Sequence, residues 1–270
     1  MRKILPILLI ALFGTTMAGC KFIVNQLAFF PDPVDQLSKP QLPPGVEERF
    51  IETEDQVRIQ LLYLPSPDAT SVLLYFHGNA GNIYHRVSDL LQLQRSGISV
   101  IGVSYRGYGK SEGTPSEEGI YQDGEAAFNY ATQELGFSQD NIIILGRSIG
   151  STVAINSAKN RTIGGLILVT PLTSGKAHAK AVGLGLISSL AGDAFDNLSR
   201  IKDITAPLLV IHGTDDRVIP FSMGRELFDR AQTKKQFIKI AGGGHNNLQA
   251  NYRLAYWSAI SGFIQQVSNQ

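Results

Sequence analysis

Cysteine is almost absent from this chain of 270 residues, because the sequence contains only one. A disulfide framework and a cysteine-rich metal cage are therefore excluded. The chain also lacks an excess of charge of one sign, since 24 Lys and Arg residues balance 23 Asp and Glu residues and give a formal net charge of +1. Proteins that bind nucleic acids usually carry a strongly basic patch. We therefore expect no nucleic-acid partner.

Motifs for metal and nucleotide cofactors are lacking as well. The sequence contains no His-Glu-x-x-His pattern of the kind that binds zinc in peptidases. The glycines of Gly107-Tyr108-Gly109 are not followed by a third glycine three positions later, so they do not form a dinucleotide-binding fingerprint. We expect the protein to use no metal and no other cofactor.

The apolar run at the amino terminus is too short to span a lipid bilayer. It covers residues 4–13, whereas a membrane-spanning helix needs about 20 apolar residues. Arg2 and Lys3 precede the run, and the small residues Ala18 and Gly19 follow it. This order of charged, apolar and small residues is typical of a signal peptide for secretion.

Residues 17–20, Met-Ala-Gly-Cys, resemble a bacterial lipobox. The resemblance implies that residues 1–19 are a lipoprotein signal peptide and that Cys20 becomes the lipidated first residue. Met17 departs from the pattern, in which leucine is more usual, and an ordinary secretory signal with an incidental free cysteine is the alternative. Lys21 does not match the aspartate of an inner-membrane retention signal. The resemblance thus implies an exported protein anchored to the bacterial cell envelope, at the outer membrane in a Gram-negative host.

Residues 20–45 are the predicted tether between this anchor and the folded domain. Large apolar residues are frequent in 21–30, and they could pack on the domain or contact lipid. Prolines recur from Pro31 to Pro44 and favour an extended, semi-rigid backbone. No internal repeat follows, so we expect residues 46–270 to form one domain.

Short apolar runs alternate with longer helical patterns through this domain. An antiparallel pair is expected to start the sheet, and the later runs are almost continuously apolar, as in strands that are covered on both faces. The predicted strands are 46–53, 57–64, 71–76, 98–103, 141–145, 166–170, 207–211 and 237–240, and the predicted helices are 86–95, 116–135, 149–159, 222–231 and 251–266. This order predicts an α/β fold with a mostly parallel sheet of about eight strands and helices on both faces. Functional residues should then lie at the carboxyl ends of the strands.

One such end carries the motif Gly-x-Ser-x-Gly over residues 146–150, between a predicted strand and a predicted helix. In this setting the serine stands on a sharp turn, and the glycines leave room for it. Ser148 is therefore a candidate nucleophile. A serine in an ordinary glycine turn is the alternative.

A serine nucleophile needs a base, and the chain offers five histidines. His77 and His212 each end a predicted strand, where a buried structural role is expected. His85 lies among polar residues, and His178 lies in a predicted lid. His245 follows the last predicted strand within a glycine-rich loop, so we expect it to be the general base.

The carboxylate that would orient this base should lie after the strand 207–211. Asp215 and Asp216 are both in the right loop, and spacing alone does not separate them. The loop 77–82 follows the first central strand, where this architecture supplies one amide of an oxyanion hole. We expect the backbone amides of Asn79 and Ile149 to be its two donors.

Four segments in this order resemble the α/β-hydrolase superfamily, and within it the Bem46-like serine hydrolases and the α/β-hydrolase domain-containing proteins 13 and 17. They cover residues 76–82, 105–113, 146–150 and 212–220. The family pattern His-Gly-Thr-x-Asp implies that Asp216 is the orienting acid. The resemblance also implies a serine hydrolase that cleaves esters or thioesters of an acylated or other small-molecule substrate through an acyl-enzyme. A peptidase or amidase of the same fold, and a surface lipoprotein that has the fold without catalysis, are the alternatives.

Two further features accompany these motifs. Residues 171–206 are predicted to form a small lid, whose apolar run 181–187 could line an acyl pocket or pack on the core. Arg147 places a positive charge at the start of a helix, which the helix dipole opposes. A salt bridge to an acidic residue is the simplest explanation for that charge.

Overall fold

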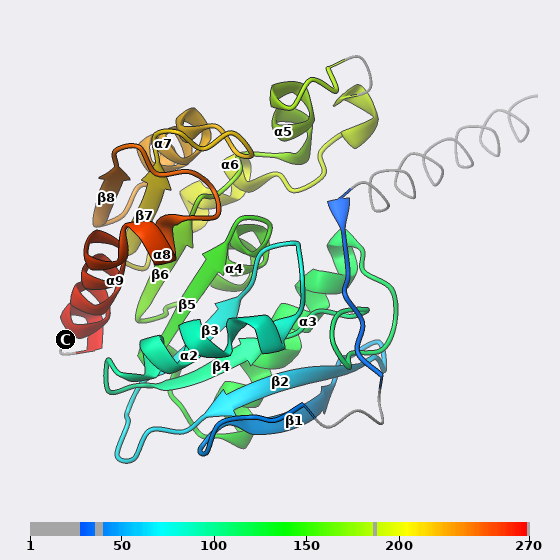
Figure 1. Cartoon of the computed structure of the whole chain (residues 1–270), viewed down its shortest axis with the longest axis vertical. Helices are drawn as coiled ribbons and strands as arrows, with labels where there is room; N and C mark the ends of the chain where they lie inside the picture. Colours follow the sequence, from blue (N-terminus) through cyan, green and yellow to red (C-terminus); the bar gives the residue numbers. More distant parts are fainter. Residues whose placement is uncertain (1–27, 36–39, 186–187, 269–270) are drawn as a thin grey trace, which may run out of the picture.

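The computed structural model describes residues 28–35, 40–185 and 188–268. The predicted signal peptide and the predicted lipidation site at Cys20 lie outside these ranges. Figure 1 shows one twisted sheet with helices on both faces, and its strands run in the order β1-β2-β4-β3-β5-β6-β7-β8. The strands are β1 (Glu47–Glu52), β2 (Arg58–Leu64), β3 (Val72–Phe76), β4 (Ser99–Val103), β5 (Ile142–Arg147), β6 (Gly165–Val169), β7 (Leu208–Gly213) and β8 (Lys235–Ile240).

The first two strands are antiparallel and the rest of the sheet is parallel. β2 pairs antiparallel with β1 and with β4, whereas the pairs from β3 to β8 are all parallel. The predicted fold class is therefore confirmed. β5 and β7 continue two residues beyond their apolar runs, because Arg147 pairs with Val169 and Gly213 pairs with Ile240.

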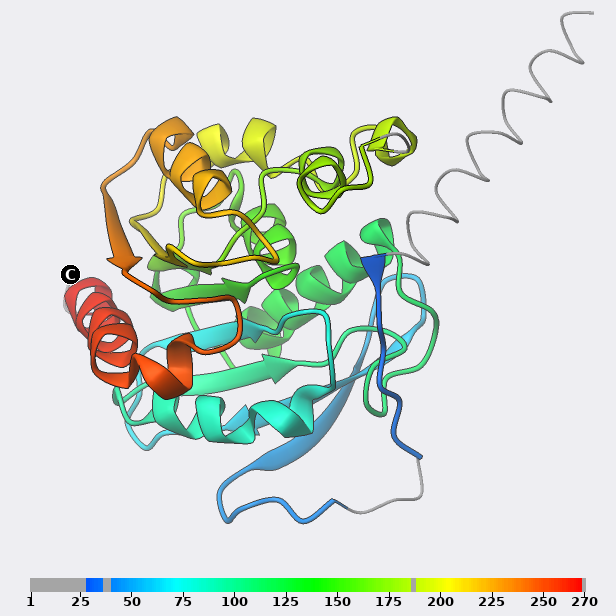
Figure 2. The same ribbon diagram turned by 45° about the horizontal axis from the view of Figure 1, so that its top comes forward.

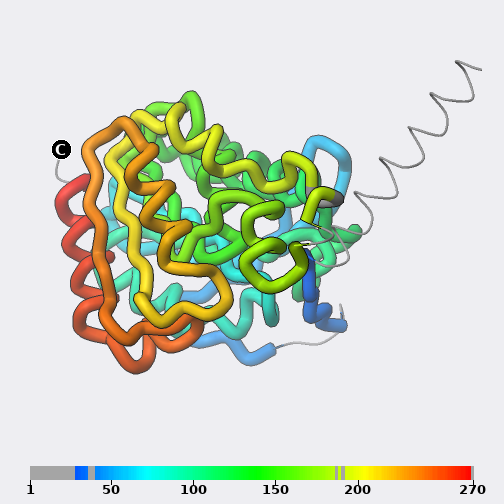
Figure 3. Tube along the Cα trace, turned by 90° about the horizontal axis from the view of Figure 1, so that it is seen from above, coloured from blue at the N-terminus to red at the C-terminus, as the bar shows by residue number. Residues whose placement is uncertain are grey.

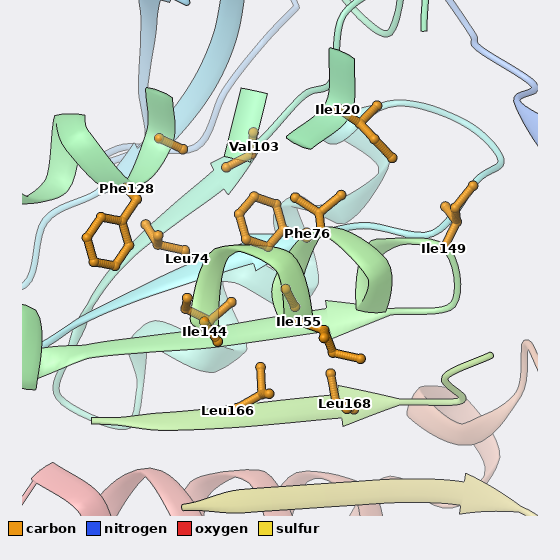
Figure 4. Close-up of a cluster of buried hydrophobic side chains, with 14 of the residues drawn as sticks. Leu74, Phe76, Val103, Ile120, Phe128, Ile144, Ile149, Ile155, Leu166 and Leu168 are labelled. Atoms are coloured by element: carbon orange, nitrogen blue, oxygen red, sulfur yellow. The ribbon is translucent and has the colours of Figure 1, made fainter. Parts of the chain in front are cut away.

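Side chains that alternate along each central strand form two separate cores. On one face, Leu74, Ile144 and Leu166 pack with residues of the helices α3 (Glu117–Asn129), α4 (Gly150–Ala158) and α7 (Phe221–Arg230), as Figure 4 shows in part. On the other face, Leu73 and Ile143 pack with residues of α2 (Val87–Gln94) and α9 (Arg253–Ser268). Successive residues of a strand point to opposite faces, so a sheet that is covered on both sides requires apolar residues at every position.

The predicted helices lie close to their expected places, with two differences. Tyr252 separates α9 from the short helix α8 (Leu248–Asn251), so the helix predicted over 251–266 begins at Arg253. The helix predicted over 116–135 is divided into α3, which begins after the N-cap Ser116, and a single π-helical turn, η2 (Tyr130–Glu134). The hydroxyl oxygen of Ser116 accepts a hydrogen bond from the amide of Gly119, which explains the sharp start. No helix in the described ranges is long and apolar enough to cross a membrane.

Residues 171–185 and 188–206 cross the carboxyl ends of the strands, and Figures 2 and 3 show them above the sheet. They contain α5 (Gly175–Ala181), η4 (Ser188–Ala191), α6 (Asn197–Arg200) and η5 (Ile201–Asp203). In the chain, this segment lies between the end of β6 at Val169 and the start of β7 at Leu208. We call residues 171–206 the lid.

Candidate functional site

Ser148 stands on the sharp turn between β5 and α4. Its backbone has a φ of 54°, in the left-handed region that non-glycine residues rarely occupy. A Cβ on Gly150 would lie 2.6 Å from the carbonyl oxygen of His77 and still closer to that of Phe76. The flanking glycine is therefore required by close backbone contact, as the motif predicts.

His245 reaches this serine from the loop after β8. Its Nε2 lies 3.0 Å from the Oγ of Ser148, and its Nδ1 lies 2.8 Å from Oδ2 of Asp216. The structure thus brings together the three side chains that the sequence singles out, although 97 residues separate Ser148 from His245. In this geometry one ring nitrogen can accept the serine proton while the other donates to the carboxylate.

Asp216, and not Asp215, faces the imidazole. The Asp216 side chain is buried, and its Oδ1 accepts hydrogen bonds from the amides of Val218 and Ile219 at 2.9 and 2.8 Å. Asp215 is exposed, and its carboxylate accepts a hydrogen bond from the hydroxyl of Thr214. Burial alone would raise the pKa of Asp216, but hydrogen bonds from His212, His245 and the Ile219 amide hold that pKa well below its ordinary value. The Asp216 carboxylate is therefore ionised at neutral pH.

His212 holds the same carboxylate from the other side, a contact that the sequence analysis missed. Its Nε2 lies 3.3 Å from Oδ2 of Asp216 and 3.0 Å from the carbonyl oxygen of Ile219. The backbone contact matches the structural role predicted for His212, and the carboxylate contact is additional. The sequence did contain a signal for this contact, because His212 ends a predicted strand and lies only four residues before Asp216.

Arg147 is hydrogen-bonded to the His245 loop, and the described residues contain no salt bridge to it. The guanidinium donates to the carbonyl oxygen of His245 and to Oδ1 of Asn246, both at 3.0 Å. The explanation by a salt bridge is therefore wrong. Arg147 instead joins the turn that carries Ser148 to the loop that carries His245.

The two predicted oxyanion donors lie beside Ser148. Ile149 immediately precedes α4, and Asn79 lies in the loop after β3. Both residues line the cavity that contains Ser148 and His245. Within the described residues, neither backbone amide donates a hydrogen bond to another group. The amides are thus available to a ligand.

An apolar cavity of about 450 Å³ opens above Ser148 between the lid and the strand ends. Its apolar lining includes Leu172, Val182 and Leu184 from the lid, together with Phe30 and Val218. No Asp or Glu side chain is among the described residues that line it. The cavity is suited to an uncharged chain of carbon atoms rather than to a cationic group.

The lid contributes one further polar group to this cavity. His178 lines it from α5, as expected for a histidine of the lid, and its Nδ1 is buried with no hydrogen-bond partner among the described residues. Burial and the neighbouring His245 lower the pKa of His178. His178 is therefore neutral at pH 7.

Metal-ligating side chains do not gather elsewhere in the described ranges. Within them, no group of three or more His, Cys, Asp or Glu side chains is placed to hold a metal ion.

Comparisons with known proteins agree with this arrangement. Residues 67–199 and 179–249 match a family described as serine aminopeptidase, S33, within a hydrolase grouping. The chain is 37% identical over 202 residues to α/β-hydrolase domain-containing protein 17B of Homo sapiens, covering 74% of this chain and 68% of that protein. This chain belongs to the α/β-hydrolase superfamily.

Two other relatives extend the comparison. The α/β-hydrolase domain-containing protein aho-3 of Caenorhabditis elegans is 34% identical over 221 residues, which cover 81% of this chain but only 65% of that protein. The solved structure of the Pyrococcus furiosus esterase Pf2001 superposes with a TM-score of 0.74 at 18% identity, covering 88% of this chain and 98% of the esterase. At that identity the likeness establishes the fold, and it shows that this hydrolase fold has esterases among its structural neighbours.

Proposed function

We propose that this hydrolase is a serine esterase that cleaves carboxylic esters or thioesters through an acyl-enzyme. The observation that carries the proposal is the chain of contacts from Ser148 Oγ to His245 Nε2 at 3.0 Å and from His245 Nδ1 to Asp216 at 2.8 Å. A serine hydroxyl is a weak nucleophile by itself, and a neighbouring imidazole activates it by removing its proton.

In the acylation step, Ser148 Oγ forms a bond to the carbonyl carbon of the substrate while its proton passes to His245 Nε2. Asp216 stabilises the resulting imidazolium by accepting the Nδ1 hydrogen bond. The negative charge on the carbonyl oxygen is received by the amides of Asn79 and Ile149. Collapse of this intermediate breaks the bond to the alcohol or thiol, which leaves with the proton from His245.

In the second step, water gives a proton to His245 Nε2 and attacks the acyl-Ser148 carbonyl. The imidazolium then returns that proton to Ser148 Oγ as the acyl-oxygen bond breaks, and the free acid leaves. The apolar cavity beside Ser148 would hold the acyl chain during both steps. Burial of apolar surface contributes about 25 cal/mol per Å², so an acyl chain that fills the cavity should bind better than acetate.

An amide substrate is the second candidate, because the matched family carries an aminopeptidase description. An aminopeptidase must bind the positively charged amino group of its substrate, and a carboxylate is the usual partner of such a group. The described cavity lining has no carboxylate and includes Arg86 and Arg147. This electrostatic setting favours the ester proposal.

A panel of p-nitrophenyl esters from acetate to laurate, with aminoacyl p-nitroanilides beside it, tests the proposal. We expect ester hydrolysis without added metal and preference for acyl chains longer than acetate. Ser148→Ala should lose nearly all of this activity. Ser157→Ala is its matched control, because Ser157 lies in the helix α4 that follows Ser148, is buried and has a hydroxyl without a partner among the described residues. Faster turnover of the anilides than of every ester would overturn the proposal in favour of the peptidase.

We also propose that the protein is exported and anchored to the cell envelope through lipidated Cys20. The support is the signal-like order of residues 1–20, which lie outside the described ranges. Stable anchoring would come from two or more acyl chains, because one chain alone gives marginal binding. In a host with a lipoprotein pathway, an alkyne fatty acid should label the protein, and Cys20→Ser should lose the label. An unlabelled protein with intact Cys20 would leave plain secretion as the alternative.

A further inference from the structure

A short segment that precedes the sheet lies directly on the candidate site. We call residues 28–34 the strap. Its backbone forms parallel bridges to two loops, from Pro31 to Gly81 and from Pro33 to Gly109. Figures 1 and 2 show this segment in blue, running along the domain from the side of the lid toward β1 and β2. Part of the predicted tether is therefore packed on the domain.

The strap is hydrogen-bonded to the side chain of Asn79, whose backbone amide is the proposed oxyanion donor. Oδ1 of Asn79 accepts from the amide of Phe30 at 2.8 Å, and Nδ2 donates to the carbonyl oxygen of Ala28 at 2.6 Å. The hydroxyl of Tyr108 donates to the same Oδ1 at 2.7 Å. Three hydrogen bonds thus fix the Asn79 side chain, and through it the orientation of the loop after β3.

Tyr108 is placed to hold both partners. Its side chain is fully buried, and its ring packs edge to face against those of His77 and Tyr105, with centroids 5.4 and 5.8 Å apart. Its hydroxyl also accepts from the amide of Phe30 at 3.2 Å. One hydroxyl therefore connects the strap to Asn79.

Two adjacent aromatic residues connect the strap to the rest of the cavity. Phe29 is buried and packs edge to face against Phe195 of the lid, with ring centroids 6.0 Å apart. Phe30 lines the cavity and is 61% exposed, so it lies at the mouth. An acyl chain that leaves the cavity at this side would contact the Phe30 ring.

We propose that the strap is part of the active site, where Tyr108 positions the Asn79 amide and Phe30 contacts the distal part of long acyl chains. The proposal rests on the proposed esterase function. The strap itself lies before the part of the chain matched to the family, which begins at residue 67. Misplacement of a donor by about 1 Å can cost on the order of 100-fold in rate. A positioning role should therefore appear in kcat rather than in KM.

The first test compares Tyr108→Phe with Tyr130→Phe. Both changes remove one hydroxyl and keep the ring, but the Tyr130 hydroxyl bonds to Arg49, away from the cavity. We expect Tyr108→Phe to lower kcat by about tenfold with KM within about twofold, since one of three hydrogen bonds to Asn79 is lost. Tyr130→Phe should leave both constants unchanged. A Tyr108→Phe enzyme with the kcat of Tyr130→Phe would overturn the positioning role.

A measurement that does not use activity accompanies this test. Hydrogen exchange of the backbone amides in 78–82 should be faster in Tyr108→Phe than in the wild type, and unchanged in Tyr130→Phe. Unchanged exchange in both variants overturns the positioning role whether or not the protein hydrolyses esters. If the wild type hydrolyses esters and the Tyr108→Phe and Phe30→Ala variants behave like it, the role of the strap alone is refuted. A wild type that hydrolyses no ester would instead refute the esterase.

The second test concerns acyl-chain preference. Phe30→Ala should lower the ratio of kcat/KM for laurate over butyrate by about fivefold, because the ring contacts only the longer chain. Leu254→Ala is the matched control, since Leu254 is an 83% exposed apolar residue that does not line the cavity. An equal ratio in Phe30→Ala, Leu254→Ala and the wild type would overturn the contribution of Phe30.

Discussion

The carboxylate of Asp216 is held from several sides. Its Oδ1 accepts hydrogen bonds from two backbone amides, and its Oδ2 contacts the imidazoles of both His245 and His212. These contacts leave the imidazole of His245 with a fixed partner on Nδ1, so its Nε2 is free to face Ser148. The neighbouring Asp215 has none of these contacts.

The two adjacent acids should therefore respond very differently to the same change. Asp216→Asn should lower kcat by about 10⁴, as in a protease triad, because the amide favours the wrong imidazole tautomer. Asp215→Asn should leave kcat within about twofold, because its side chain is exposed and bonds only to Thr214 among the described residues. Steady-state kinetics on one ester decides between them. If Asp215→Asn is the crippling change, the assignment of the acid is wrong.

The lowered pKa of Asp216 also predicts a dependence of stability on pH. A carboxylate whose pKa is lower in the folded state contributes stability above its unfolded value, near 3.8, and loses it as the pH falls further. The wild type should thus lose more free energy of unfolding than Asp216→Asn between pH 6 and pH 3. Urea unfolding at the two pH values measures this difference. An equal loss in both proteins would contradict the ionised, hydrogen-bonded carboxylate.

Among the structural elements, the turn from β5 to α4 is tightly constrained. Ser148 has a positive φ, and the helix after it packs so closely on β3 that position 150 has no room for a side chain. Ile149, the residue between Ser148 and α4, thereby lines the cavity. Backbone strain of this kind is kept only where the surrounding structure fixes it.

Glycine-to-alanine changes in two helices should shift the free energy of unfolding in opposite directions. Gly150→Ala should lower the free energy of unfolding by about 3 kcal/mol, because its methyl group would overlap the backbone after β3. Gly262→Ala in α9 should raise it by about 0.5 to 1 kcal/mol, because nothing lies within 4 Å of its Cβ and alanine favours a helix. Urea unfolding at pH 7 compares them. A stable Gly150→Ala protein would contradict the close packing of this turn.

The sequence predicted these elements well because their signals are local. Apolar runs marked each strand, and Gly-x-Ser-x-Gly marked the turn that carries Ser148. Apart from the three side chains Ser148, His245 and Asp216, which the motifs singled out, the contacts that join distant segments were not predicted. Arg147 bonds to a loop 98 residues away, and the strap bonds to Asn79 across 49 residues. No local pattern encodes such pairs, since they form only when the sheet brings the ends of its strands together.

At the scale of the whole molecule, the site is assembled from loops that follow β3, β5, β7 and β8, which all lie on the parallel side of the sheet, with β6 between β5 and β7. Residues of the strap and of the lid line the cavity above Ser148. No single segment contains the site. The central claim is therefore that these loops make Ser148 a reactive nucleophile.

Labelling with a fluorophosphonate tests this claim most directly, because the reagent reacts with an activated serine whatever the natural substrate is. We expect one adduct, located by peptide mass spectrometry on Ser148. The adduct should be absent in Ser148→Ala, unchanged in Ser157→Ala and formed much more slowly in His245→Ala. An unlabelled wild type, an adduct on another serine, or equal labelling of wild type and His245→Ala would contradict it.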